Sequence, residues 1–499
     1  MLFNSYAFLF VFLPLALAAF YGLRGFGLLR ASVASLTLAS IAFYAYWKPA
    51  DTLILLSTIV FNYFISCYLT RVDGRASRLL LALGICGDLG LLFYFKYFNF
   101  IAINVTALAG IDYVARAIVM PIGISFFTFT QIAYLVDCFR SRTYERNFVN
   151  YALFVTIFPH LIAGPIIHHA QMRPQFDKMA RERIDPEMVK MGLVIFVVGL
   201  AKKVLLADNL VLGADAVFDG AEQGASYGAL TAWTGVVAYT LQIYFDFSGY
   251  SDMAIGLALL FGLRLPLNFD SPYKSRSIVE FWRRWHMTLS AWLRDYLYIP
   301  LGGNQGGEWM RLRNVFITML LGGIWHGAGW TFVIWGALHG SYIVVNHVLR
   351  LRKPGHNRVA AAASPWIGRG KQAVTLLLVM IAWVFFRAKT VGAADSILAS
   401  MALGARVPGA PPALDPVLYG WMIVATVIAL WLPNTQELVG YQPKPTEPLR
   451  LPDGPILPAL RAGRPALAAV PAVAILCGLL FAAAFAQLWR PAIFIYFNF

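Results

Sequence analysis

The sequence contains few charged residues and few cysteines, and both shortages restrict what the chain can be. Only 13% of the 499 residues are charged and 59% are hydrophobic, whereas soluble domains carry about a quarter charged residues. The four cysteines, Cys67, Cys86, Cys138 and Cys477, lie in or beside apolar runs without metal-binding or redox spacing. The composition excludes a soluble globular domain, and we expect the cysteines to be small buried residues.

Several familiar sequence patterns are missing as well. There is no Gly-x-Ser-x-Gly nucleophile elbow, no Walker phosphate loop and no dinucleotide-binding glycine fingerprint. The alternating pattern of outer-membrane strands is also absent. Hydrolase and ATPase activities therefore have no support in the sequence, and neither does a β-barrel.

Long apolar runs are what the chain has in abundance. Many reach about 18 residues, the length that a helix needs to cross a bilayer. They predict an all-α polytopic membrane protein with about ten spans plus re-entrant segments, in a single integral-membrane domain over residues 1–499. The first run, Ser5–Tyr21, is interpreted as an uncleaved span because Arg24 and Arg30 follow it rather than precede it.

The net charge of +15 comes largely from arginine and lysine in short loops between the apolar runs. The positive-inside rule accounts for most of this pattern, so the excess does not indicate nucleic-acid binding. Arg24 and Arg30 place the first loop in the cytosol, and the N-terminus is therefore predicted to be periplasmic.

Two apolar runs have basic residues on both flanks, which conflicts with a simple crossing. The first, Tyr151–His168, follows Arg146 and precedes Arg173. Its centre holds Pro159-His160 and Gly164-Pro165. We predict a re-entrant segment beside a cavity, because irregular backbone at membrane depth is tolerated only where protein or enclosed water satisfies it.

The second such run is Asn314–Leu349, which lies between Arg313 and Arg350. It is predicted to enter and leave on the cytosolic side, turning at the glycines that follow His326. An ionisable group at that depth is costly to keep and indicates function, and an imidazole exchanges protons near neutral pH. His326 is thus the leading catalytic candidate, with Trp325 beside it; the alternative is a histidine that only hydrogen-bonds a neighbouring helix.

Polar residues also gather between Tyr244 and Asn304. Asp246 and Asp252 follow the end of a span, where they either cap helices or orient a catalytic imidazole. Interpreted as one helix, Phe281–Asn304 places His286 on an aromatic face, opposite the basic residues. Such a helix suits the cytosolic interface, either as an anchor or as part of the site.

The remaining histidines are less promising. His339 and His347 have no glycine-flanked turn and are interpreted as packing or interface residues. His160, His168 and His169 match no known metal-site spacing, so no metal is predicted.

Together, these motifs resemble the membrane-bound O-acyltransferase (MBOAT) family, in its bacterial alginate O-acetyltransferase-like branch. The motif-bearing core extends from about residue 121 to 349. The matching strings are Phe95–Asn99, Pro121–Phe127, Phe158–Pro165, Leu241–Gly256, Glu280–His286, Trp292–Tyr298, Leu320–Gly327 and the terminal Tyr496–Phe499. Relatives often carry an arginine soon after the Ala-Gly-Pro string, where this chain has His168 and His169.

The resemblance implies a helical bundle with a central funnel and tunnel in the bacterial inner membrane. It implies that His326 is the catalytic histidine and His286 the second histidine of the site. The donor is expected to be cytosolic acetyl-CoA, with no other cofactor, and the acceptor an exopolysaccharide such as alginate. Expected partners are periplasmic acetyltransferases or acceptor-handling proteins, a polysaccharide synthase complex and membrane lipids.

In the mechanism that we expect, His326 removes a proton from the acceptor hydroxyl. His286 or a backbone N–H polarises the thioester carbonyl. Five arginines on the cytosolic side either pair with CoA phosphates or merely reflect the topology: Arg276, Arg283, Arg284, Arg311 and Arg313. Two alternatives stay open: the same chemistry on peptidoglycan, cellulose or another envelope acceptor, and a transporter or flippase that performs no chemistry.

Overall fold

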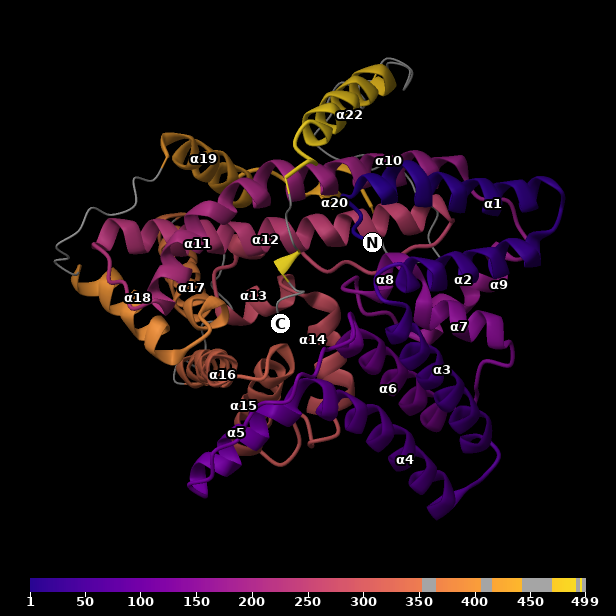
Figure 1. Cartoon of the computed structure of the whole chain (residues 1–499), viewed down its shortest axis with the longest axis horizontal. Coiled ribbons are helices and arrows are strands. Elements are labelled where there is room, and N and C mark those ends of the chain that lie inside the picture. Colours follow the sequence, from indigo (N-terminus) through magenta and orange to yellow (C-terminus); the bar gives the residue numbers. More distant parts are fainter. Residues whose placement is uncertain (352–364, 405–414, 442–468, 491–493, 496–499) are drawn as a thin grey trace. The chain divides into compact units, whose positions relative to one another are not determined.

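The computed structural model describes residues 1–351, 365–404, 415–441, 469–490 and 494–495. These residues form helices joined by turns and short irregular segments (Figure 1), so the all-α class is confirmed. Most of the Pro-rich segment Pro433–Pro465 and the terminal motif Tyr496–Phe499 lie outside the described residues. The prediction of one acyltransferase domain over the whole chain stays a prediction.

Several helices have the length and composition of membrane spans. Among the residues that the structure describes, five helices are long and apolar enough to cross a bilayer: Phe8–Gly25, Pro49–Leu69, Gly74–Leu108, Trp330–Leu349 and Pro365–Arg387. Shorter apolar helices cover Leu29–Ala45, Val391–Leu403, Pro416–Leu430 and Val473–Phe485. The polytopic architecture predicted from the apolar runs is thereby confirmed.

The chain divides into two compact units. The first comprises Met1–Ala201, Gly249–Leu267 and Thr435–Pro491, and the second comprises Lys202–Ser248, Asn268–Asn434 and Ala492–Phe499. The N-terminal helices of the first unit are η1 (Phe8–Phe12), α1 (Leu13–Gly25), α2 (Leu29–Ala45), α3 (Pro49–Leu69), α4 (Gly74–Leu92), η2 (Phe93–Tyr97), α5 (Phe98–Leu108) and α6 (Ile124–Ser141).

Buried polar side chains connect the helices of the first unit. Asn62 of α3 donates through Nδ2 to Asp88 Oδ1 of α4 at 2.8 Å and to Gln131 Oε1 of α6 at 3.1 Å. The Tyr151 hydroxyl of α7 (Phe148–Thr156) donates to the same Gln131 oxygen at 3.2 Å. Since polar groups inside a bundle need partners, this network favours one packing of the four helices.

The predicted interruption within Tyr151–His168 is confirmed. α7 ends at Thr156, and a four-residue helix, α8 (Phe158–Leu161), follows with Pro159 in its first turn. The chain is then irregular up to α9 (His169–Met179). A side chain at Gly164 would lie 2.6 Å from the Pro159 carbonyl oxygen, so the tight return of the backbone requires glycine.

His168 and His169 both face carboxylates in the first unit. His169 Nε2 lies 3.3 Å from Glu145 Oε2, which is 3.7 Å from Arg173 Nε, and His168 Nδ1 lies 4.0 Å from Asp137 Oδ2. Burial raises the pKa of Glu145, but the hydrogen bond from His169 and the nearby positive charges outweigh it, so the net pKa is lowered. His169 thus holds the start of α9 against the loop that carries Glu145, and His168, just before α9, faces Asp137 of α6.

The remaining helices of the first unit are α10 (Pro186–Ala201), α20 (Thr435–Val439), α22 (Ala469–Phe485) and the end of α12 (Ala229–Leu260). Gly192 of α10 and Gly256 of α12 meet backbone to backbone, because a Cβ on Gly192 would lie 2.7 Å from the Gly256 carbonyl oxygen. Small residues permit such close helix packing in membranes. Among the cysteines, only Cys138 is buried as expected; Cys67 and Cys477 are half-buried and Cys86 is exposed, so the expectation was wrong for those three.

The second unit contains His286, His326 and His339, which line the site described below. Its elements are η3 (Lys202–Ala207), α11 (Asp208–Glu222), the first part of α12, η4 (Pro272–Lys274), α13 (Ile278–Arg284), α14 (Met287–Leu293), η5 (Arg294–Tyr298), α15 (Glu308–His326), α16 (Trp330–Leu351), α17 (Pro365–Arg387), α18 (Val391–Leu403) and α19 (Pro416–Leu430). Arg387 at the end of α17 lies 2.7 Å from Asp215 of α11, which joins these two helices.

Candidate active site

The hairpin predicted for Asn314–Leu349 is present as α15 and α16, with the turn at Gly327–Gly329. Glycines let the two helices approach, since a Cβ on Gly323 would lie 2.5 Å from the Phe332 carbonyl oxygen and 2.8 Å from Gly336 Cα. His326 is the last residue of α15 and is only 4% exposed. The hairpin therefore buries the imidazole where its two helices converge.

Aromatic rings surround His326. The centroid of its ring lies 4.9 Å from that of Trp325, 5.1 Å from that of Trp335 and 5.1 Å from that of Phe386. Trp335 comes from α16 and Phe386 from α17, so the contacts join three helices. Such packing restricts the imidazole to one orientation and lowers the local dielectric, which strengthens any electrostatic interaction made there.

The single helix expected over Phe281–Asn304 was wrong. α13 ends at Arg284, Trp285 is extended, and His286 adopts the left-handed conformation with φ 42° and ψ 53° before α14 begins at Met287. A non-glycine residue in this region is strained by about 1–3 kcal/mol and is retained where surrounding contacts enforce it. The break turns His286 out of the predicted amphipathic face and buries it completely.

Asn268 holds this break in place. Its Oδ1 lies 3.0 Å from His286 Nδ1 and accepts from the Thr288 hydroxyl at 3.0 Å, while its carbonyl oxygen accepts from the Met287 N–H at 3.0 Å. Because Oδ1 can only accept, His286 donates through Nδ1, and the neutral ring then carries its lone pair on Nε2. Asn268 thus selects the tautomer of His286 and positions its ring.

The two candidate histidines lie close together. Their ring centroids are 6.4 Å apart, and His286 also packs edge-on against Phe247 at 4.8 Å. Two imidazoles enclosed by aromatic rings can pass a proton to and from a small substrate group, because a neutral imidazole has one nitrogen that accepts a proton and one that donates. The arrangement suits acid–base chemistry on a group that enters between them.

Asp246, a supporting candidate, pairs with a lysine rather than with a histidine. Asp246 Oδ1 lies 2.6 Å from Lys203 Nζ, and the same nitrogen lies 2.6 Å from Asp208 Oδ1. Asp246 Oδ2 accepts the backbone N–H of Ile495 at 2.9 Å. Lys203 and Asp246 are almost entirely buried, so this ionic cluster (Lys203, Asp208 and Asp246) joins η3, α11, α12 and the segment around Ile495.

Asp252, the other aspartate candidate, belongs to the first unit. Its carboxylate accepts from the Thr435 hydroxyl and from Gln436 Nε2, both at 2.6 Å. These two residues begin α20, so Asp252 joins that short helix to α12.

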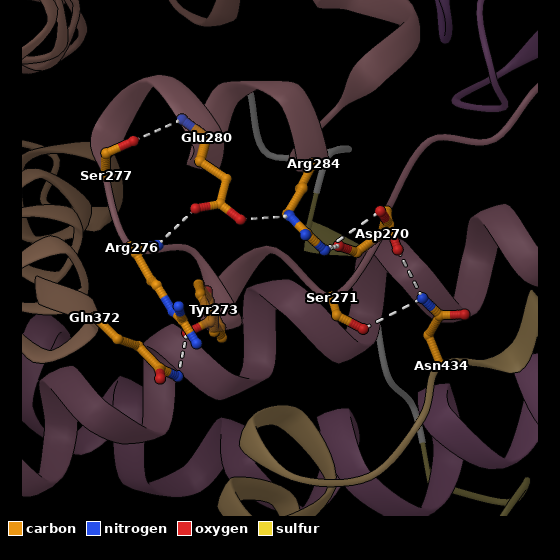
Figure 2. Close-up of polar contacts among 9 residues, drawn as sticks. All are labelled: Asp270, Ser271, Tyr273, Arg276, Ser277, Glu280, Arg284, Gln372 and Asn434. Carbon is orange, nitrogen blue, oxygen red and sulfur yellow. Dashed lines mark hydrogen bonds and ion pairs between the residues drawn. The ribbon is translucent and has the colours of Figure 1, made fainter. Parts of the chain in front are cut away.

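The arginines expected to meet a phosphorylated donor divide into two groups. Arg284 is held by Glu280 at 3.2 Å and by Asp270 at 3.3 Å (Figure 2). Arg283 is exposed and has no ion pair among the described residues. It lines a cavity of about 460 Å³ together with Asp270, Ser277, Val279, Glu280 and Arg284. Within this group, Arg283 is the residue whose charge stays available to an anion.

The other three arginines lie around the same helices. Arg276 donates its backbone N–H to Glu280 at 2.9 Å (Figure 2), and its exposed guanidinium has no ion pair among the described residues. Arg311 pairs with Glu308 at 2.6 Å, and Arg313 donates to Asn314 Oδ1 at 2.9 Å. Arg283 and Arg284 thus end α13, Arg276 precedes that helix, and Arg311 and Arg313 lie near the start of α15.

Sequence reasoning missed two members of the site region. Asn268 lies in an irregular segment, and its partner His286 is 18 positions away, so no periodicity connects them. His339, predicted to be a packing or interface residue, is fully buried in the aromatic layer behind His326, where its Nδ1 accepts from Trp282 Nε1 at 3.2 Å, a hydrogen bond that the sequence did not indicate. A polar residue inside an apolar helix was the signal available for His339.

Known proteins share this arrangement of motifs. The model of the membrane-bound O-acyltransferase (MBOAT) family matches residues 91–386, a segment that includes His286, His326 and His339. This chain belongs to the MBOAT family. Within the family, it is 45% identical over 398 residues to the probable alginate O-acetylase AlgI of Pseudomonas aeruginosa, covering 78% of this chain and 72% of that protein.

Two further MBOAT-type relatives have other names. The peptidoglycan O-acetyltransferase of Helicobacter pylori is 40% identical over 434 residues, which is 80% of each chain. The teichoic acid D-alanyltransferase of Streptococcus thermophilus is 28% identical over 247 residues, covering 48% of this chain and 59% of that protein. The names share acyl transfer and differ in the acceptor, so this MBOAT protein is an acyltransferase of the membrane.

Proposed function

We propose that this MBOAT protein takes acetyl groups from cytosolic acetyl-CoA and passes them across the bacterial inner membrane for O-acetylation of an exopolysaccharide, with alginate as the favoured acceptor. The observation that carries the proposal is the pair of buried imidazoles, His286 and His326, whose centroids are 6.4 Å apart inside an apolar hairpin region. The 45% identity to a probable alginate O-acetylase supports the choice of polymer.

In the proposed reaction, His326 acts as general base. It removes the proton of the acceptor hydroxyl while that oxygen attacks the thioester carbon, so a C–O bond forms and the carbonyl electron pair moves onto oxygen. Collapse of this intermediate restores the carbonyl and breaks the C–S bond, and the imidazolium returns its proton to the CoA thiolate. General-base assistance of this kind contributes roughly 10²- to 10⁴-fold to the rate.

His286 has a different part in the proposed reaction from the one expected from the sequence. With Asn268 accepting from Nδ1, the neutral ring presents a lone pair at Nε2, which accepts a proton rather than polarising a carbonyl. We therefore assign His286 to proton transfer with His326. Stabilisation of the developing oxyanion then falls to other donors.

The donor side is proposed to lie at α13 and the start of α15. Exposed Arg283 beside a cavity of about 460 Å³ suits the phosphates of CoA, because guanidinium groups recognise phosphate bidentately. Basic loops face the cytosol under the positive-inside rule, which also gives a periplasmic N-terminus. Periplasmic acetyltransferases and a polysaccharide synthase are the partners expected to receive the acetyl group and present the polymer.

A second acceptor has support from a relative. The 40% identity to a peptidoglycan O-acetyltransferase covers 80% of both chains, so peptidoglycan is the alternative substrate for the same chemistry. Cellulose and other envelope polymers would use the same donor side. A transporter that performs no chemistry would move the group without releasing CoA.

The deciding experiment measures CoA release by the purified protein in lipid nanodiscs supplied with acetyl-CoA and an alginate oligosaccharide as the acceptor. His326→Ala and His286→Ala are expected to lose activity by at least 10²-fold while folding normally. His347→Ala is the matched control, because His347 lies on α16 and is half-buried. Full activity of His326→Ala would refute the mechanism, and acetyl movement without CoA release would establish a transporter.

A further inference from the structure

A second layer of aromatic residues lies directly behind His326. The Trp335 ring is 5.1 Å from the His326 ring and 4.8 Å from the His339 ring. His339 also meets Trp282 at 5.1 Å and stacks on Phe281 at 6.2 Å with an interplanar angle of 6°. The layer continues from the catalytic candidate into α13 and α16.

Trp282 determines which nitrogen of His339 carries the proton. The indole Nε1–H donates to His339 Nδ1 at 3.2 Å, and an indole nitrogen has no ability to accept. His339 Nδ1 must therefore present its lone pair, so the ring is neutral and its proton resides on Nε2. Trp282 is thus a positioning residue that converts His339 into a donor at Nε2.

Beside the Trp383 Nε1–H of α17, two N–H donors on α16 in this layer are left without an acceptor by the described residues. They are His339 Nε2 and Trp335 Nε1. Both side chains are buried, His339 at 0% and Trp335 at 1% exposure. Residues 335 and 339 are one turn apart on α16 and share a face. Buried donors normally find partners, so two adjacent ones without an acceptor indicate a place for an oxygen-bearing ligand.

We propose that Trp335 Nε1–H and His339 Nε2–H donate hydrogen bonds to the carbonyl oxygen of the acyl group while it is transferred at His326. This inference rests on the proposed acetyl transfer. As the acceptor oxygen forms its bond to the thioester carbon, the carbonyl electron pair moves to oxygen, where the two donors stabilise the negative charge. The pair returns as the C–S bond breaks, and the CoA thiolate takes the proton held by His326.

The location suits that task. Trp335 contacts His326 directly, so an oxygen bound by its N–H lies beside the base that activates the acceptor. The surroundings are Phe386, Trp383 and Phe281, which exclude water and increase the effect of a hydrogen bond on a developing charge. His286 presents a lone pair at Nε2 in its neutral form, so it does not compete for this role.

The test compares variants that remove a donor with variants that keep it. Trp335→Phe removes the indole N–H and keeps an aromatic ring. His339→Asn loses the donor at the Nε2 position, whereas the longer His339→Gln retains an amide N–H there. We expect kcat for CoA release to fall roughly 10²- to 10³-fold in Trp335→Phe and His339→Asn, with KM for acetyl-CoA unchanged. His339→Gln is expected to recover at least a tenth of the wild-type kcat.

A spectroscopic measurement shows whether Trp335 and His339 donate hydrogen bonds to the acetyl carbonyl or only pack within the aromatic layer. Acetyl-CoA labelled with ¹³C at the carbonyl is bound to the His326→Ala protein, and the carbonyl stretch is recorded by infrared difference spectroscopy. Hydrogen bonds from Trp335 and His339 are expected to lower the stretching frequency, and adding Trp335→Phe is expected to raise it again. Trp309→Phe, at an exposed position of α15, serves as the matched control.

The outcomes distinguish the two proposals. Wild-type CoA release with normal kcat in Trp335→Phe and His339→Asn overturns the oxyanion role and leaves the acetyltransferase standing. A rise in KM at constant kcat also overturns it, since the donors would then bind the ground state only. An inactive wild type with no acetyl-CoA binding refutes the proposed function itself, and this inference with it.

Discussion

Two buried polar regions of the second unit differ in what their polar groups face: in one, each charge faces an opposite charge, and in the other, N–H donors lack an acceptor among the described residues. In the ionic cluster, Lys203 lies 2.6 Å from both Asp208 and Asp246. In the histidine layer, Trp335 Nε1 and His339 Nε2 have no acceptor among the described residues. Buried polar groups that are paired within the protein fix the packing of helices, whereas buried donors without a protein acceptor indicate that a ligand supplies one. We infer that the first region serves the fold and the second the reaction.

The largest expected effect comes from breaking the ionic cluster. Lys203→Met leaves two buried carboxylates without their cation and is expected to lower the free energy of unfolding by about 3–5 kcal/mol. Thermal unfolding in detergent, followed by intrinsic fluorescence, measures the loss.

The control replaces the whole ionic cluster with apolar residues. A triple variant, Lys203→Met with Asp208→Leu and Asp246→Leu, is expected to regain most of that stability. Replacing a whole buried ionic group by apolar residues often leaves the free energy of unfolding unchanged. If this variant folds but no longer transfers acetyl groups, the cluster takes part in chemistry and the contrast between the two regions fails.

The next effect concerns the orientation of His286. Asn268→Ala removes the acceptor that fixes Nδ1, and kcat for CoA release is expected to fall by about 10²-fold, as misplaced catalytic groups commonly cause. Asn268→Asp keeps an acceptor oxygen and should retain far more activity. Equal kcat values for the two variants would show that the hydrogen bond to His286 is dispensable.

A smaller effect is expected from substitution of the adjacent residues Arg283 and Arg284, which should change different properties. Arg283 is exposed without an ion pair among the described residues, so Arg283→Ala is expected to raise KM for acetyl-CoA roughly 3- to 10-fold, equivalent to about 1 kcal/mol. Arg284 is already held by Asp270 and Glu280, so Arg284→Ala should mainly lower stability, by up to about 1 kcal/mol. Titrations with acetyl-CoA and melting curves test both, and an unchanged KM for Arg283→Ala contradicts the assignment.

The smallest effect is a pH dependence in the first unit. The pKa of Glu145 is lowered in the folded protein, where the His169 hydrogen bond and nearby positive charges outweigh burial. Its contribution to stability is therefore present above the unfolded pKa and lost as the pH falls through the folded one. Glu145→Gln should be less stable than wild type at neutral pH, with the difference shrinking in acid. A constant difference between pH 7 and about pH 3 would contradict this.

The sequence predicted what depends on composition and on charge along the chain. The α15–α16 hairpin followed from basic residues on both flanks and from the glycines after His326, and the interruption near Pro159 followed in the same way. The left-handed turn at His286 could not be predicted, because it depends on Asn268 folding back onto the residues that follow. Helical periodicity assumes an unbroken helix, and so it misplaced the His286 side chain.

The pairings of Asp246 and His339 escaped prediction for a related reason. Lys203 and Asp246 are 43 positions apart, and Trp282 and His339 are 57 positions apart, so only the tertiary fold brings them together. Two alternatives were predicted for Asp246, capping a helix and orienting a catalytic imidazole, and both were wrong. Neither alternative considered a buried lysine.

One hydrogen bond of Asp246 is of a kind that sequence comparison detects poorly. The carboxylate accepts the main-chain N–H of Ile495, not a side chain. Every amino acid except proline supplies that N–H. Exchange of Ile495 for other residues would leave the hydrogen bond intact, so selection acting on it leaves almost no trace in residue identity. Alignments will under-report this attachment, and Ile495→Pro is the substitution that reveals it.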